Sequence, residues 1–242
     1  MNTKSFLSNI FLTLTILISY TFAASAQDIN RTDSNGLKQG KWQKTYSNGA
    51  LRYQGTFKNG KPTGEFKYYY PSGEIKAVIK YSTDGKSSYA KTYRLNGNLL
   101  AEGKYIEKKR DSTWLFYSET DGKIITKKEY KNGKLDGKSI IFFPGKDIPS
   151  EITEYKNGMK NGISEKFYTD GTPFSLETYV NDTLNGKFIV RFPDGKPQIE
   201  GQYKNGNQSG MWITYDENGK IIKRERFNNG LPVKNDNKQN TR

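Results

Sequence analysis

Apolar and polar residues alternate with a period of two along most of the chain, from about residue 40 to residue 233. Such alternation predicts β-strands that bury one face. The apolar positions of two consecutive stretches are Phe66, Tyr68 and Tyr70, followed by Ile75, Ala77, Ile79 and Tyr81. Because the spacing of helical faces is nearly absent, the pattern predicts an all-β protein.

The alternating stretches belong to a repeat of 24 or 25 residues. The phrase Tyr-Lys-Asn-Gly opens at Tyr130, Tyr155 and Tyr203, and related phrases open at equivalent places. A fixed period of this length is typical of arrays in which neighbouring units stack. The opening aromatics, which we expect to form the core, are Phe57, Tyr81, Tyr105, Tyr130, Tyr155, Tyr179, Tyr203 and Phe227.

Two turn signals separate the strands of each unit. The pair Asn48-Gly49 lies between the two strands of the first unit, and Asn59-Gly60 follows its second strand. Asx-Gly pairs between alternating stretches are strong hairpin signals. We therefore expect residues 40–233 to form an elongated antiparallel meander of about eight tandem β-hairpins, open or closed on itself. A propeller, which has about four strands per blade, would require a longer period. We expect a local bend or bulge at residues 107–111 and 144–149.

The chain begins with the pattern of a secretory signal. Lys4 precedes an apolar stretch from Phe6 to Phe22, and Ala24-Ser25-Ala26 has the form of a cleavage site. Residues 1–26 are therefore expected to be a signal peptide, with an uncleaved anchor as the alternative. Residues 27–39 and 234–242 form a polar N-terminal segment and a polar C-terminal tail. Export predicts a location in the periplasm, the cell envelope or the extracellular space.

The repeated phrase Tyr-Lys-Asn-Gly-Lys-x-x-Gly, as at residues 130–137, resembles the MORN repeat. The second Asx-Gly turn in each unit is similar to the bacterial variant found in YwqK-type antitoxin-like proteins. The resemblance extends over the eight units. It implies an elongated all-β array that serves as a binding or dimerisation platform, with protein or phospholipid contacts, and it implies no shared catalytic residues.

The composition excludes several kinds of active site. The chain contains no Cys and no His, so Ser–His and Cys–His nucleophiles and the usual zinc sites are impossible. A hydrolase with two carboxylates remains, but the acidic residues either fall in turns or lie at strand positions that vary. We therefore predict that the protein is not an enzyme and has no cofactor or metal. The acidic residues considered are Asp121, Asp170, Asp194, Glu102, Glu177, Glu200 and Glu225.

The formal net charge of +14 makes an anionic partner plausible. Lysines recur around the second turn of the units, where they would form a ladder along one edge of the sheet. Such a ladder suits weak multivalent contacts with anionic lipid or polysaccharide, although exposed turns also carry Lys for solubility. The leading hypothesis is an exported scaffold that binds a protein or a second copy of itself, and no nucleic acid is expected. The candidate lysines are Lys58, Lys61, Lys131, Lys134, Lys156, Lys160 and Lys204.

Overall fold

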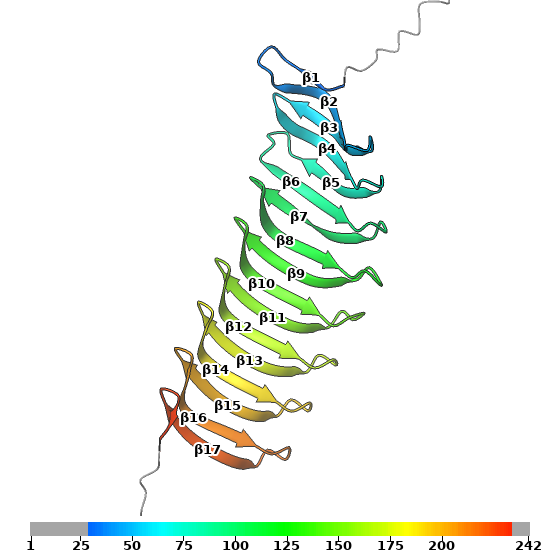
Figure 1. The fold of residues 1–242 in the computed structure, drawn as a ribbon. Helices are drawn as coiled ribbons and strands as arrows, with labels where there is room; N and C mark the ends of the chain where they lie inside the picture. Colours follow the sequence, from blue (N-terminus) through cyan, green and yellow to red (C-terminus); the bar gives the residue numbers. More distant parts are fainter. Residues whose placement is uncertain (1–28, 234–242) are drawn as a thin grey trace, which may run out of the picture.

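The computed structural model describes residues 29–233, and these residues form one sheet of 18 antiparallel strands with no helix (Figure 1). The predicted signal peptide (1–26) and C-terminal tail (234–242) lie outside the described residues. No described helix could span a membrane. The strands are β1 Arg31–Thr32, β2 Lys38–Thr45, β3 Leu51–Lys58, β4 Lys61–Tyr69, β5 Ile75–Tyr81, β6 Ser87–Tyr93, β7 Leu99–Ile106, β8 Lys109–Tyr117, β9 Ile124–Lys131, β10 Lys134–Phe142, β11 Pro149–Lys156, β12 Met159–Phe167, β13 Pro173–Val180, β14 Thr183–Arg191, β15 Pro197–Lys204, β16 Asn207–Tyr215, β17 Ile221–Asn228 and β18 Leu231–Pro232.

Each strand pairs with the next one along the chain, so the sheet is a meander. The strands from β2 to β17 make eight successive hairpins, which confirms the predicted all-β architecture. Within the described residues β1 pairs with β2 and β18 with β17, and the sheet is open. The short β1 comes from the polar segment 27–39 and covers part of the first edge.

The two Asx-Gly signals of a unit form different turns at opposite edges of the sheet. In the second turn both Asn59 and Gly60 have positive φ, 50° and 73°, as the tight two-residue hairpin requires. In the first turn Gly49 has a φ of 81°, while Asn48 is not among the residues with positive φ. The Gly49 N–H donates to the carbonyl of Tyr46, and this loop is longer. The two rows of turns form the first-turn edge and the second-turn edge.

Of the two predicted irregularities, the one at 144–149 is present and the one at 107–111 is not. Glu107 and Lys108 both have positive φ, 49° and 65°, and make the ordinary tight turn, so the expected irregularity beginning at Glu107 is wrong. The second turn that differs from the tight two-residue form lies between β5 and β6. Residues 82–86 form a longer loop there, and the two strands pair without a register shift. The 144–149 irregularity is a first turn lengthened by one residue, in which the Phe143 N–H donates to the carbonyl of Ile148.

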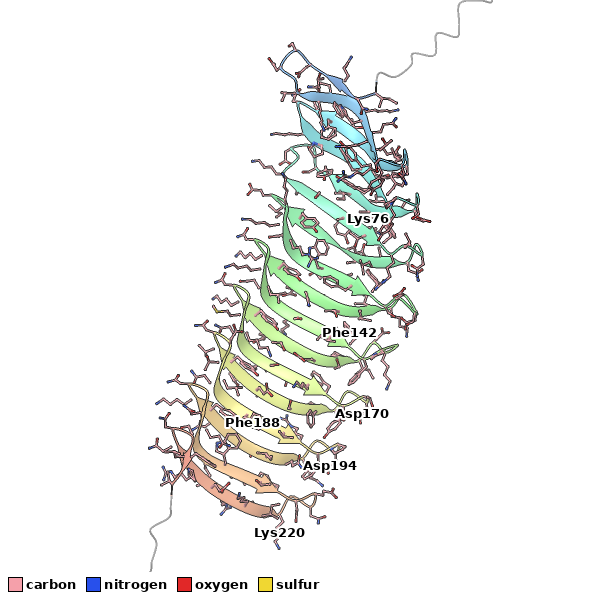
Figure 2. The ribbon with its side chains drawn as sticks, in the orientation of Figure 1. Lys76, Phe142, Asp170, Phe188, Asp194 and Lys220 are labelled. Carbon is pink, nitrogen blue, oxygen red and sulfur yellow. The ribbon has the colours of Figure 1, made fainter. Side chains whose placement is uncertain are left out.

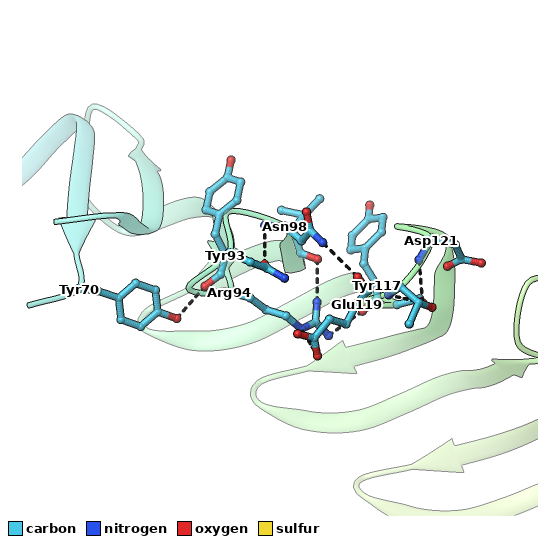
Figure 3. A network of polar contacts seen from close by, with 11 residues as sticks. Tyr70, Tyr93, Arg94, Asn98, Tyr117, Glu119 and Asp121 are labelled. Atoms are coloured by element: carbon cyan, nitrogen blue, oxygen red, sulfur yellow. Dashed lines mark hydrogen bonds and ion pairs between the residues drawn. The ribbon is translucent and has the colours of Figure 1, made fainter. Parts of the chain in front are cut away.

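Side chains at the first-turn edge tie each unit to the next (Figure 3). The Tyr70 hydroxyl donates to the carbonyl of Tyr93 at 2.8 Å, and the Arg94 guanidinium donates to the carbonyl of Tyr117 at 2.9 Å. Each bond joins residues 23 positions apart in the sequence. The repeats are therefore linked by side chains as well as by the backbone ladder.

Most of the buried side chains form a thin layer on one face of the sheet, which we call the aromatic face. Ile189, which is 2% exposed, alternates with Phe188 and lies on the other face. On the aromatic face, Phe66 and Trp114 are each 1% exposed. The Trp114 ring lies on Gly103, where an added Cβ would be 2.4 Å from the ring. The opening tyrosines predicted as core also lie on this face, as Tyr105 does against Trp114, but they are only half-buried because no second layer of described residues covers them.

Candidate binding face

The aromatic face carries an open groove across the first four units, which we call the N-terminal groove. Its volume is ≈ 940 Å³, and it extends from Lys44 and Tyr46 on the first unit to Trp114 and Phe116 on the fourth. About half of its lining residues are aromatic, and the ring centroids of Tyr53 and Tyr68, for example, are 5.9 Å apart. The groove thus combines apolar ring faces with hydroxyl groups.

Four cationic side chains line the N-terminal groove, namely Lys44, Arg52, Lys76 and Arg110. The Arg110 guanidinium lies 4.6 Å from the Trp114 ring centroid, and the Lys76 ammonium 5.5 Å from that of Tyr70. No Asp or Glu lines the groove, and the described ion pairs do not include these four cations. The groove is therefore a positively charged aromatic surface.

A β-bulge directs two of these cations into the groove. Leu51 and Tyr53 have partners on β2, whereas Arg52 between them has none and is the extra residue of the bulge. Lys76 has the same place in the next unit. Bulges change the direction of a side chain relative to simple alternation. The lysines predicted from the sequence all lie around the second turn. The sequence signal for this site was instead a cationic residue shortly after the first turn, as at Arg52 and Lys76.

A polar window interrupts the aromatic face in the middle of the array. Its small hydroxyl residues are at most 6% exposed. The Thr153 and Ser164 hydroxyl oxygens are 2.8 Å apart, and Thr153 also donates to Glu151. The Tyr179 hydroxyl donates to Glu177 at 2.6 Å, and burial followed by this bond raises the pKa of Tyr179. The hydroxyl residues of the window are Ser139, Thr153, Ser164 and Ser175.

The acidic residues considered in the sequence are engaged by neighbouring groups of the fold. Tyr117 donates to Glu102, which also pairs with Lys91, and the Thr172 N–H donates to Asp170 in a first turn. That backbone hydrogen bond lowers the pKa of Asp170. Glu151, which no feature of the sequence distinguishes from the other acidic residues, is brought by the fold to the polar window. No group of three or more acidic side chains in residues 29–233 could hold a metal ion.

A second group of rings lies on the aromatic face of the last two units, with Phe188 and Trp212 at its centre. Their ring centroids are 5.3 Å apart, and Tyr203 and Phe227 contact the Trp212 ring edge-on. We call these four residues the C-terminal aromatic cluster (Phe188 is labelled in Figure 2). Exposed apolar side chains occur along the whole array, and the two with the largest exposed fractions, Ile222 and Leu231, lie at this end.

The predicted lysines lie at the second-turn edge, opposite the edge that carries Asp170 and Asp194 in Figure 2. All are exposed except Lys160, which is half-buried with its ammonium 4.9 Å from the Tyr179 ring centroid. Acidic residues interrupt the row, because Asp136 and Asp182 accept backbone hydrogen bonds at this edge. The structure thus places these side chains along one edge, and none of them lines the N-terminal groove: Lys58, Lys61, Lys131, Lys134, Lys156, Lys160 and Lys204.

Comparison with known proteins identifies the repeat. A search of curated proteins finds no match. A family model described as a MORN repeat variant matches five stretches, 38–59, 62–86, 160–181, 184–205 and 208–229. Residues 87–159, which it does not match, fold into the same meander from β6 to β11. Five of the eight units of this chain are therefore MORN repeats.

Proposed function

We propose that the protein is an exported, non-catalytic scaffold that binds a protein partner, with a second copy of the chain as the simplest case. The observation that carries the proposal is the C-terminal end of the sheet, where the two most exposed large apolar side chains of the described residues lie. Ile222 on β17 is 62% exposed and Leu231 on β18 is 72% exposed. MORN repeats are generally associated with protein or membrane-lipid binding. Exposed apolar patches beside aromatic rings are typical of protein interaction sites.

The role as a scaffold is supported by the absence of a recognisable reaction centre in the described residues. Glutamates such as Glu102 and Glu177 are engaged in hydrogen bonds with neighbouring tyrosines. Because the array is a single sheet, its functional groups are spread along a face and two edges. Such a surface suits recognition of a large partner. The second Asx-Gly turn in each unit supports the narrower resemblance to YwqK-type repeat proteins as part of this proposal.

Light scattering and cross-linking test the proposed interface. Replacing both Ile222 and Leu231 by Asp should abolish a concentration-dependent increase in mass, or recovery of a cross-linked protein partner in the native host. Leu95→Asp is the matched control, since Leu95 is 56% exposed on the third unit. A monomer without partners at every concentration, or equal effects of the two sets, would reject the C-terminal interface.

A second candidate is binding of anionic lipid or polysaccharide along the second-turn edge. The observation in its favour is the row of exposed lysines that includes Lys131 and Lys134. Contacts of this kind weaken with salt. If vesicles of phosphatidylglycerol bound a Lys131→Glu and Lys134→Glu variant as well as the unchanged protein, this candidate would fail.

Export is part of the proposal and has its own test. The sequence expectation is cleavage after Ala26, which would leave Gln27 at the mature N-terminus. Mass spectrometry of the protein from fractionated native cells would identify that terminus and its compartment. An intact N-terminus recovered from the cytoplasm would refute export.

A further inference from the structure

We propose that the N-terminal groove binds an acidic polysaccharide, a chain of sugar rings that carry carboxylate or sulfate groups. The site uses only residues of the first four units. It therefore shares no residue with the proposed protein interface at the C-terminal end or with the lysine row at the second-turn edge.

The charge of the groove selects an anion. Its lining contains Lys44, Arg52, Lys76 and Arg110 and no carboxylate. An incoming anion would not have to displace a carboxylate, because the ion pairs of the described residues do not include these cations. Arg110 donates one long hydrogen bond, at 3.4 Å, to the Tyr130 hydroxyl. Charge-assisted hydrogen bonds from such groups are among the stronger polar contacts.

The cations are particular to the first units and are not a general property of the repeat. Arg52 and Lys76 occupy the bulge after the first turn in units one and two. The corresponding residue of unit three is Leu100, and that of unit eight is Ile222. A requirement for solubility alone would not confine the cations to the part of the face that is hollowed into a groove.

Aromatic rings lie beside these cations in an arrangement suited to sugars. Arg52 lies 5.8 Å from the Tyr46 ring centroid, and Arg110 lies near both Trp114 and Phe116. Sugar rings have apolar C–H faces that pack on aromatic rings, with hydroxyl groups around their edges. Tyr68 also lines the groove, and its hydroxyl is protonated at neutral pH, as tyrosine ordinarily is.

The shape of the groove favours an extended polymer. The lining runs from β2 to β8, which at about 4.8 Å per strand is a length of roughly 30 Å. A flat bilayer would not readily reach Arg110, which is half-buried within the groove.

Two other extended polymers fit the groove less well. Interior strands such as β4 and β7 are paired on both sides, so a peptide has no free strand edge to extend. Four cations over this length are also sparse compared with the phosphates of a nucleic acid, one per ~3.4 Å of each strand in a duplex.

Calorimetric titration with polygalacturonate at about 150 mM salt tests the proposal. The groove variant carries Arg52→Gln and Lys76→Gln, and the matched control carries Lys156→Gln and Lys204→Gln with the same change in net charge. The groove variant should lose about tenfold or more in affinity, while the control should lose about twofold or less. All four side chains are exposed, so circular dichroism should show unchanged folding.

Several outcomes would overturn the proposal. They are no binding of polygalacturonate or dextran sulfate, equal losses in the two variants, or a larger loss in the control. Equal binding of neutral dextran would also overturn it, since the cations would then have no role. Tighter binding of polyglutamate, oligothymidylate or phosphatidylglycerol vesicles would instead identify an acidic protein, a nucleic acid or a membrane. Because the light-scattering test uses other residues, the two proposals can fail separately.

Discussion

The contact between Trp114 and Gly103 allows a quantitative test of how the aromatic face packs. Trp114 is 1% exposed, and a Cβ on Gly103 would lie 2.4 Å from Cδ2 of its ring. One unit earlier the equivalent pair is Ile79 on β5 and Ala90 on β6. There the large residue lies on the earlier strand and the small residue on the later strand, the reverse of Gly103 and Trp114. The array therefore fills this place in two complementary ways.

Exchanging one arrangement for the other should produce strong coupling. Gly103→Ile alone pushes a branched side chain into the Trp114 ring and should cost at least about 3 kcal/mol. Trp114→Ala alone removes a buried ring and should cost about 3–5 kcal/mol. The double variant reproduces the Ile79 and Ala90 arrangement, and its loss should be about 2–3 kcal/mol smaller than the sum.

Urea unfolding followed by far-ultraviolet circular dichroism measures these free energies through the midpoint and slope. If the single variants unfold before urea is added, Gly103→Ala with Trp114→Leu is a milder pair for the same cycle. Additivity within about 0.5 kcal/mol would refute the reasoning, because it would show that the ring does not depend on the missing side chain beneath it.

Three further predictions concern turns and buried groups. Ser112 has a φ of 59° at a bulge where other units have Gly, so Ser112→Gly should stabilise the protein by about 0.5–1 kcal/mol in urea unfolding, whereas Ser88→Gly, where φ is not positive, should not. Trp114→Phe should cost about 1 kcal/mol more than Trp212→Phe, because the Trp114 Nε1 donates to Lys104 while that of Trp212 has no partner in the described residues; equal losses would contradict this. The pKa of Asp170 is lowered in the folded state. The stability that its carboxylate contributes is therefore present above the unfolded-state pKa of ~3.9 and is lost as the pH falls through the folded-state pKa. With no His in the chain, the melting temperature should be flat from about pH 5 to 8 and fall in acid, and a transition near pH 6.5 would contradict this assignment.

The sequence by itself determined the strands, the turns and the number of units. Period-two alternation specifies which side chains share a face, and Asx-Gly pairs specify where the chain reverses, because few other residues accept positive φ. The residues involved are neighbours in sequence, so both signals are local. The glycine that recurs in the first strand of most units has a local explanation too. In the fifth unit it is Gly137, whose φ of 110° favours glycine.

The tertiary structure decided how the face of the sheet is divided. Alternation alone would place Arg52 and Tyr53 on opposite faces of the sheet, but the bulge turns Arg52 toward the N-terminal groove. The groove and the polar window around Thr153 depend on side chains from several strands, and a one-residue shift in register would rearrange them. Burial was also a tertiary property, since the opening tyrosines stay half-buried on a single sheet while Trp114 is covered by its neighbours. The sequence could specify positions along each strand, and only the stacked sheet determined which positions meet.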